Sequence, residues 1–192
     1  MSNITVYFRY FKDQEIRESE NIKISKYLPK YMKIGFSILL EEKVIDMDDY
    51  ILCPLYHNEI QVGVTGGIKE KEESKAACAR ELGEEVGLVP ISLNDLIPVV
   101  KTENKRECTC YALHIGRTSP VLKSEHKESI NKEFPDTRNK VGCFVHGNVS
   151  SILAHMCQSE IYMYFSEDRI IGVGMVPVID IIRLIKDGYF GL

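Results

Sequence analysis

The chain has 192 residues, of which 44% are hydrophobic and 27% are charged, and its formal net charge is −4. These values are typical of one globular domain, expected over residues 1–192, and they argue against a protein that binds nucleic acid by bulk attraction to phosphate. The N-terminal residues lack the apolar segment of a secretion signal, and the longest apolar run, 170–185, carries charges and a proline. The sequence therefore predicts a cytoplasmic protein without a membrane span.

The first part of the chain divides into a polar segment and a strand-rich segment. Residues 1–33 are charged, contain several tyrosines and show no clear period, so we expect an N-terminal elaboration of the domain. From residue 34 the chain shows short apolar runs separated by polar turns. This pattern predicts strands over 34–42, 50–58 and 59–67.

A helix is predicted next, over residues 73–86. Ser74 is its expected N-cap, and Gly87 is expected in the left-handed conformation that commonly ends a helix. Pro90 prevents the helix from continuing.

The remainder of the chain alternates between strands and helices. Residues 117–140 are polar, contain two prolines and are predicted to form a long loop or an insertion. Around this segment the pattern predicts strands over 96–102, 106–116, 141–147 and 169–178, and helices over 148–158 and 177–188. The expected fold is α+β, with a mixed β-sheet flanked by helices in an α/β/α sandwich.

Neither the cysteines nor the histidines show the spacing of a metal site. Cys108 and Cys110 form the one close pair, and residues two apart on a strand share a face, so a packing role is simpler than half of a zinc site. No C-x-x-C pair and no paired histidine spacing occurs in the sequence. We expect reduced thiols at Cys53, Cys78, Cys108, Cys110, Cys143 and Cys157.

The predicted helix at 73–86 carries an unfavourable concentration of negative charge near its C-terminal end. Glu81, Glu84 and Glu85 are three and four residues apart and therefore share one helix face. Like charges at these spacings destabilise a helix, and the helix dipole opposes carboxylates at its C-terminus. Arg80 alone does not neutralise three carboxylates.

Two interpretations account for this face. A solvated charged surface is the common explanation of a charge run. A divalent cation explains the spacing better, because hard cations such as Mg²⁺ prefer oxygen ligands. The glycines Gly66 and Gly67 precede the helix and can bring backbone carbonyls close to the same ion. The spacing alone therefore indicates a cation site and does not identify a reaction.

The segment from residue 66 to residue 88 resembles a known family motif. Its order is glycine, five residues, glutamate, seven residues, Arg-Glu-aliphatic, one residue, Glu-Glu, one residue and Gly-aliphatic. This is the pattern of the Nudix box, and the chain meets it at Gly66, Glu72, Arg80, Glu81, Leu82, Glu84, Glu85, Gly87 and Leu88. The resemblance covers about residues 34–187 and leaves out the N-terminal segment and the loop at 117–140.

The resemblance implies a hydrolase that cleaves the diphosphate bond of a nucleoside diphosphate linked to another moiety, with Mg²⁺ or Mn²⁺. By analogy with the family, Glu81, Glu84 and Glu85 hold the metal and Arg80 supports their geometry. Glu72 and Gly87 have structural roles in the motif. Such an ion would neutralise the diphosphate and lower the pKa of a bound water, and a carboxylate would orient or deprotonate that water.

The chain departs from the family in the approach to the motif. Many members have Pro-Gly-Gly there, whereas this chain has Val64-Thr65-Gly66-Gly67, with the motif starting at the first glycine. The metal-facing carbonyl could therefore belong to Thr65, to Gly66, which we favour, or to Gly67.

A further acid often comes from a downstream loop in this family. Here Glu125, Glu128 and Glu133 are the candidates, against the alternative that this loop only solvates the surface.

The sequence is compatible with three functions. The leading one is a pyrophosphohydrolase acting on a small nucleotide such as ADP-ribose, a dinucleotide or a modified dNTP. The second is an mRNA-decapping enzyme, for which capped RNA would be the substrate and the lysines of the loop at 117–140 a basic path. The third is a non-catalytic module that binds a nucleotide. A homodimer is compatible with each of them.

Overall fold

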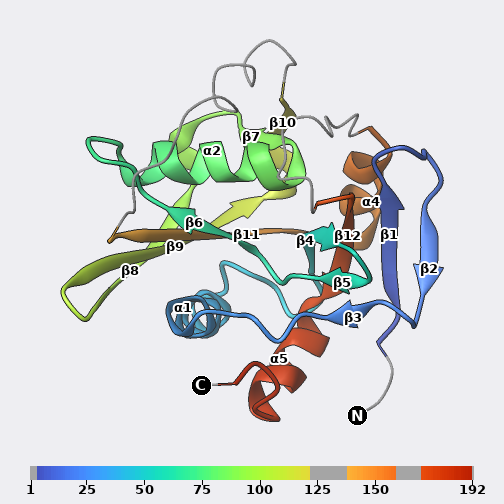
Figure 1. Cartoon of the computed structure of the whole chain (residues 1–192), viewed down its shortest axis with the longest axis horizontal. Coiled ribbons are helices and arrows are strands. Elements are labelled where there is room, and N and C mark those ends of the chain that lie inside the picture. Colours follow the sequence, from blue (N-terminus) through green and yellow to red (C-terminus); the bar gives the residue numbers. More distant parts are fainter. Residues whose placement is uncertain (1–3, 122–137, 159–169, 192) are drawn as a thin grey trace.

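A mixed sheet with helices on both of its faces forms the domain (Figure 1). The computed structural model describes residues 4–121, 138–158 and 170–191. Helices α2 and α4 pack on one face of the sheet, and helices α1 and α5 pack on the other. The helices of the described part are α1 (Lys30–Glu41), α2 (Ser74–Val86), α4 (Val149–Gln158) and α5 (Val178–Lys186). This arrangement confirms the predicted α+β class.

The main path of the sheet runs in the order β2-β1-β12-β4-β11-β9-β8. Strand β11 pairs with β9 in parallel and with β4 and β6 in antiparallel orientation, so the sheet is mixed. The strands on this path are β1 (Val6–Tyr10), β2 (Arg17–Ser19), β4 (Tyr50–Tyr56), β8 (Ile97–Glu103), β9 (Arg106–His114), β11 (Lys140–Gly147) and β12 (Gly172–Pro177).

Shorter elements complete the described structure. Strand β6 pairs with the first half of β11, β3 and β5 pair with each other beside β4, and β7 and β10 form a separate two-stranded sheet. These elements are β3 (Lys23–Ile24), β5 (Glu59–Ile60), β6 (Val64–Gly67), β7 (Leu88–Pro90) and β10 (Thr118–Pro120), with 3₁₀ turns η1 (Leu93–Asp95) and η2 (Ile115–Arg117).

The prediction of a strand over 34–42 is wrong, because residues 34–41 belong to α1 and Glu42 is its C-cap. The β-branched and aromatic residues of this stretch suggested a strand, but the buried positions follow the helical spacing of i, i+3, i+4 and i+7. The residues with this spacing are Met32, Gly35, Phe36 and Leu39, and all four face the core. A Cβ on Gly35 would lie 2.6 Å from Cβ of Cys110, so the glycine allows α1 to approach the sheet closely.

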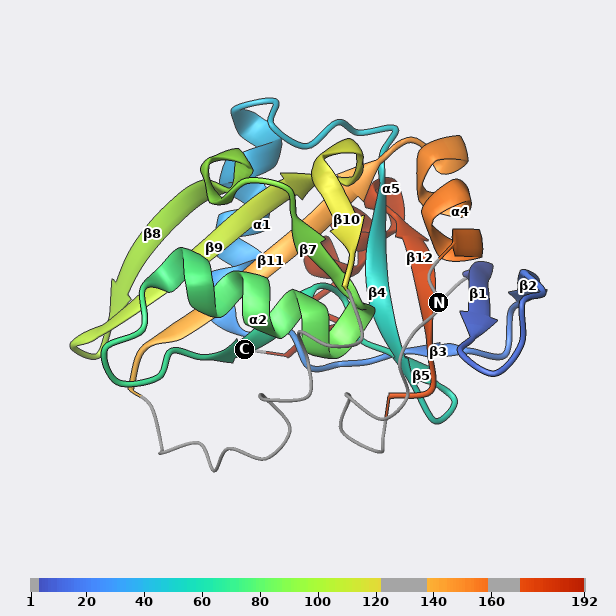
Figure 2. The same ribbon diagram turned by 90° about the horizontal axis from the view of Figure 1, so that it is seen from above.

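Part of residues 1–33, which we expected to be an N-terminal elaboration, belongs to the sheet itself. Strand β1 pairs with β12 over Tyr7 to Tyr10, which places the start of the chain beside residues 172–175 (Figure 2). Two buried side chains of β1, Val6 and Phe8, join the core on the α1 side. The domain therefore includes the N-terminal segment from β1 onwards.

Helix α2 matches the helix predicted over 73–86 in extent, but it begins differently. Its N-cap is Glu73 and not Ser74, and no side-chain hydrogen bond caps it. Ser74 is the first helical residue, and its hydroxyl accepts a hydrogen bond from the hydroxyl of Tyr111 at 2.9 Å. Gly87 ends the helix in the left-handed conformation at φ 70°, as predicted, and its N–H donates to the carbonyl of Leu82.

The predicted packing role of Cys108 and Cys110 is confirmed. Both side chains are buried on the α1 side of β9. Cys157 alone of the six cysteines is exposed, and none of them forms a disulfide. In the described part of the chain, no helix combines the length and the apolar character needed to cross a bilayer.

Candidate functional site

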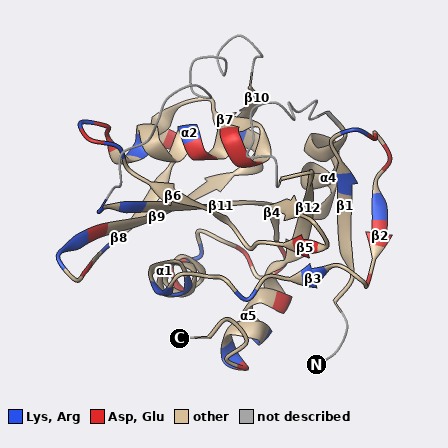
Figure 3. Ribbon diagram, in the orientation of Figure 1, with Lys and Arg blue, Asp and Glu red and all other residues tan. Residues whose placement is uncertain are grey.

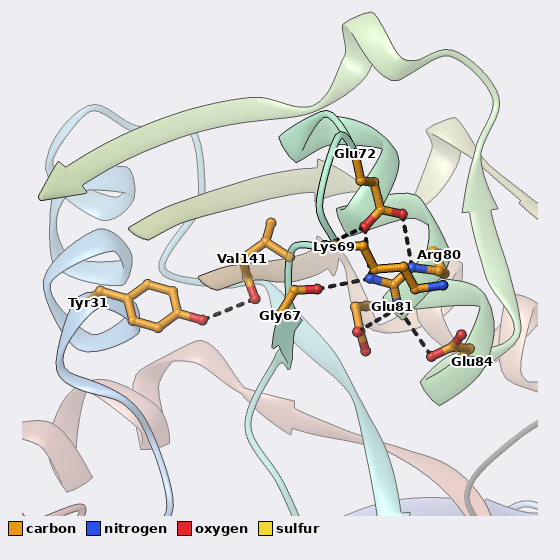
Figure 4. A network of polar contacts seen from close by, with 8 residues as sticks. All are labelled: Tyr31, Gly67, Lys69, Glu72, Arg80, Glu81, Glu84 and Val141. Carbon is orange, nitrogen blue, oxygen red and sulfur yellow. Dashed lines mark hydrogen bonds and ion pairs between the residues drawn. The ribbon is translucent and has the colours of Figure 1, made fainter. Parts of the chain in front are cut away.

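Helix α2 brings Glu81 and Glu84 close to the end of strand β6, as the close view in Figure 4 shows. Gly66 on β6 and Glu81 on α2 are in direct contact. A Cβ on residue 66 would overlap Cδ, Oε1 and Cγ of Glu81. The first glycine of the motif therefore provides the space in which the Glu81 side chain lies.

Arg80 is the centre of a polar network that holds these elements together (Figure 4). Its Nε and Nη2 donate to the two carboxylate oxygens of Glu72, each at 3.0 Å. Its Nη2 also donates to the carbonyl of Gly67, and its Nη1 donates to Oε1 of Glu81, both at 2.9 Å. The backbone N–H of Lys69 donates to Glu72 at 3.1 Å. One guanidinium thus links β6, the following loop and α2 through its several donors.

The charges in this network stabilise one another although they are largely buried. Burial opposes the charged form of Arg80, but its hydrogen bonds with Glu72 and the charges of Glu81 and Glu84 raise its pKa above the ordinary value. Burial likewise raises the pKa of Glu72, yet the bonds from Arg80 and from the Lys69 N–H lower it by more, so the net shift is downward. Both groups are therefore ionised at neutral pH.

The three carboxylates of α2 differ in their surroundings. The Glu81 side chain is 14% exposed and the Glu84 side chain 20%, while Glu85 is buried with 9% exposure. Oε2 of Glu84 lies 3.6 Å from Nη1 of Arg80. The neighbouring apolar residues Leu82 and Val86 are buried in the core between α2 and the sheet. Burial of these apolar residues anchors the helix and offsets the repulsion among its three glutamates, Glu81, Glu84 and Glu85.

The structure bears on which carbonyl faces this site. The carbonyl of Gly67 accepts the hydrogen bond from Arg80 and so belongs to the network that orients Glu81. Thr65 and Gly66 remain the two candidates for a carbonyl that faces a cation.

Tyr31 is a neighbour of the site that the sequence did not indicate, because its segment was expected to lie outside the matched region. Its hydroxyl donates to the carbonyl of Val141 at 3.0 Å, and Val141 is the register partner of Gly66 (Figure 4). Burial raises the pKa of Tyr31 well above its usual range, so the hydroxyl stays protonated and remains a donor. The helical spacing of the apolar residues in α1 was the signal that could have placed it.

The candidate acids of the downstream loop, Glu125, Glu128 and Glu133, lie outside the described residues.

The histidines lie away from the carboxylate cluster. His146 is buried at the far end of β11, where its Nδ1 lies 2.9 Å from Oδ2 of Asp49. His114 packs edge-on against His146 with ring centroids 5.3 Å apart. These histidines stand at the end of β11 opposite to the one that pairs with Gly66 and Gly67.

The oxygen atoms of the carboxylate cluster are of the ligand type that a hard divalent cation prefers. Glu81, Glu84 and Glu85 supply carboxylate oxygens, the ligand type that Mg²⁺ and Mn²⁺ prefer. Within residues 4–121, 138–158 and 170–191, however, no three acidic, histidine or cysteine side chains are preassembled as a metal-binding group. Arg80 contacts Glu81 and Glu84, so a cation would have to draw these carboxylates towards itself from the guanidinium.

In comparisons with known proteins, no family model, no curated protein and no solved structure matches the chain.

Proposed function

We propose that this protein is a Nudix-type pyrophosphohydrolase that uses Mg²⁺ or Mn²⁺ to cleave the diphosphate bond of a nucleoside diphosphate linked to another moiety. The observation that carries the proposal is the contact of Glu81 with Gly66, held by the Arg80 network. It gives a physical reason for the first glycine, the arginine and the first α2 glutamate of the 66–88 motif. A merely solvated face would not need a glycine 15 residues upstream of Glu81.

In this proposal each residue of the cluster has a defined task. Glu81, Glu84 and Glu85 would hold the cation, and Arg80 and Glu72 would keep Glu81 in place before substrate arrives. When bound, the cation would neutralise the diphosphate and lower the pKa of a water. The water oxygen would form a bond to one phosphorus as the bridging P–O bond breaks, and a carboxylate of the cluster would accept the proton of the water.

Glu85→Gln tests this assignment. The amide has nearly the shape of the carboxylate and can still form hydrogen bonds, so the fold should persist. Turnover should fall by roughly two or more orders of magnitude, which is the scale of losing one electrostatic or metal-holding group. Turnover is measured on a panel of ADP-ribose, dinucleoside polyphosphates, NADH, oxidised dNTPs and capped RNA, with circular dichroism to confirm folding.

Glu18→Gln on the exposed strand β2 is the matched control, and it should leave turnover unchanged. If Glu85→Gln and wild type have equal activity, Glu85 does not hold the cation. Binding of a nucleotide without hydrolysis of any panel member would favour a non-catalytic module instead.

A further inference from the structure

Strand β8 forms one border of the main sheet, and its outer edge is open. The main path of the sheet ends at β8, and β9 is the only strand of the described residues that pairs with it. Figure 2 shows β8 at the outer side of the sheet, beside β9. Within the part of the chain that the structure describes, no turn or loop backbone bonds to residues 97–103 either. Such an edge is a template for pairing with a strand of another chain.

The β8–β9 hairpin determines which backbone groups of β8 face outward. The turn residues 104–105 have left-handed φ values of 51° and 65°, which suits a two-residue turn flanked by the hydrogen-bonded pair of Glu103 and Arg106. Hydrogen-bonded pairs alternate along an antiparallel ladder, so the odd-numbered residues of β8 bond to β9 and the even-numbered ones point outward. Pro98 agrees with this alternation, because a proline in an edge strand has its missing N–H on the open side.

Apolar side chains border the open edge. In the described part of the chain, four of the eight exposed large hydrophobic side chains lie within residues 91–100. They are Ile91 (66% exposed), Leu93 (39%), Ile97 (44%) and Val100 (61%). The charged residues of β8, Lys101 and Glu103, lie toward the hairpin tip (Figure 3). Unpaired backbone next to exposed apolar side chains favours contact with another chain over contact with water.

We propose that the open edge of β8 pairs with β8 of a second copy of this chain, in antiparallel orientation and about a two-fold axis at Val100. The Val100 N–H of each copy would donate to the Val100 carbonyl of the other, and each Thr102 N–H would donate to the Pro98 carbonyl of the other. These four bonds pair every outward N–H of both strands, because Pro98 has none. The result is a dimer with one continuous sheet, and it does not depend on the proposed function.

The residues of β8 favour the axis at Val100 over other alignments. A two-fold axis at Pro98 would bring together two residues without N–H groups, and an axis at Lys101 would place like charges directly opposite each other. An axis at Thr102 would shift the pairing into the turn, and an axis at Val99 would leave the Thr102 N–H without a partner strand residue. The axis at Val100 avoids all four defects.

Side chains across the proposed interface are compatible with this alignment. The two Val100 side chains would be neighbours on one face of the joined sheet. On the other face Ile97 would lie opposite Glu103, and Val99 would lie opposite Lys101, whose aliphatic stem can cover it. A single pair of short strands buries less than the about 800 Å² per partner of a standard interface, so we expect a reversible dimer with a Kd in the micromolar range.

Sedimentation velocity of the full chain from about 1 to about 100 µM tests the dimer. Wild type should pass from the 21.9 kDa of one chain to twice that mass. Val100→Glu should stay monomeric, because two carboxylates would meet at the axis, and it should fold as wild type does, because Val100 is 61% exposed. Thr102→Pro removes two of the four bonds and should weaken dimerisation by at least about tenfold.

Val149→Glu is the matched control, because it makes the same substitution at an exposed valine on α4, and it should dimerise as wild type does. A mixture then tests the axis itself. Val100→Lys alone should be monomeric, but an equimolar mixture of Val100→Glu and Val100→Lys should dimerise, because a carboxylate then faces an ammonium group.

A wild type that stays monomeric at about 100 µM would overturn the inference and leave the edge to a strand of another protein. Equal dimerisation of Val100→Glu and wild type, or loss of the dimer in Val149→Glu, would show that β8 is not the contact. A mixture of the two charged variants that stays monomeric would refute the axis at Val100. Masses that grow beyond two chains with concentration would contradict a closed two-fold pair.

Discussion

Gly66 illustrates at the scale of one residue how a glycine can be required by a side chain distant in sequence. Its position is filled by Glu81, which lies where a Cβ would be. From the sequence we expected the glycines to bring backbone carbonyls near a cation. For the carbonyl of Gly66 this is still a hypothesis. The structure adds a steric role that spacing alone does not reveal.

Gly66→Ala should therefore displace Glu81 and reduce turnover by at least about tenfold, as expected for a misplaced catalytic group. The new methyl group should also lower the free energy of unfolding by about 1–3 kcal/mol, which is the usual cost of overpacking. Enzyme kinetics and urea unfolding measure the two effects. In the control Gly116→Ala the added Cβ would lie 3.1 Å from Nδ1 of His114, away from the cluster, and turnover should not change. Full activity of Gly66→Ala would show that Glu81 need not stay in this place.

The residues of the cluster could be predicted from the sequence, but their partners could only in part. Helical spacing placed Glu81, Glu84 and Glu85 near one another on α2, and the structure retains this placement. The bond from Arg80 to Gly67 could not be foreseen, because it depends on how closely α2 approaches β6. That approach is decided by packing of the whole helix and not by any local pattern.

At the scale of elements, α1 reaches the candidate site from the opposite face of the sheet. Tyr31 donates to the carbonyl of Val141, and Met32 packs where Gly142 and Gly63 leave room for it. The sequence missed this helix because its β-branched and aromatic residues resemble a strand, while tertiary contacts select the helical period. Helix and strand propensities predict secondary structure poorly where the burial of side chains in the core determines it.

Tyr31→Phe removes the hydroxyl and leaves the Val141 carbonyl without this donor. The free energy of unfolding should fall by about 1 kcal/mol, the typical net contribution of one hydrogen bond. Urea unfolding measures the change. Tyr27→Phe is the matched control, because Tyr27 is 58% exposed, and its change should stay within about 0.5 kcal/mol. A loss in Tyr31→Phe no larger than in the control would mean that this bond contributes nothing.

The far end of β11 carries a buried titratable group, His146, from which we expect the fold to lose stability in acid. Burial lowers the pKa of His146; the hydrogen bond with Asp49 and the charge of Asp49 raise this pKa by less, and His114 lowers it further. A folded-state pKa below the unfolded value, about 6.5, means that the unfolded state binds more protons in this range. The stabilising effect of neutral His146 is therefore complete above about pH 6.5 and is lost as the pH falls below it.

Urea midpoints at about pH 7.5 and about pH 5.5 test this linkage. Wild type should lose more stability between the two pH values than His146→Gln does. The exposed His57 provides the control, since His57→Gln should keep the loss seen in wild type. The same loss in wild type and in His146→Gln would contradict a role for His146.

At the scale of the whole molecule, the fold joins the two ends of the chain in one sheet. Strand β1 pairs with β12, and Tyr189 near the C-terminus packs against the core that α1 also covers. Sequence patterns predicted most central and C-terminal strands and the helices at 73–86, 148–158 and 177–188. They could not predict the pairing of β1 with β12, because such contacts depend on residues more than 160 positions apart.

The central claim, that the carboxylate cluster performs cation-dependent hydrolysis, is tested most directly by the rate of diphosphate hydrolysis as a function of free Mg²⁺. The full chain is first treated with EDTA and then assayed on its best substrate of the panel, beside Glu81→Gln. We predict no hydrolysis in EDTA, recovery on adding Mg²⁺ or Mn²⁺, and a higher Mg²⁺ requirement or no recovery in Glu81→Gln. Undiminished hydrolysis in metal-free buffer would contradict the account.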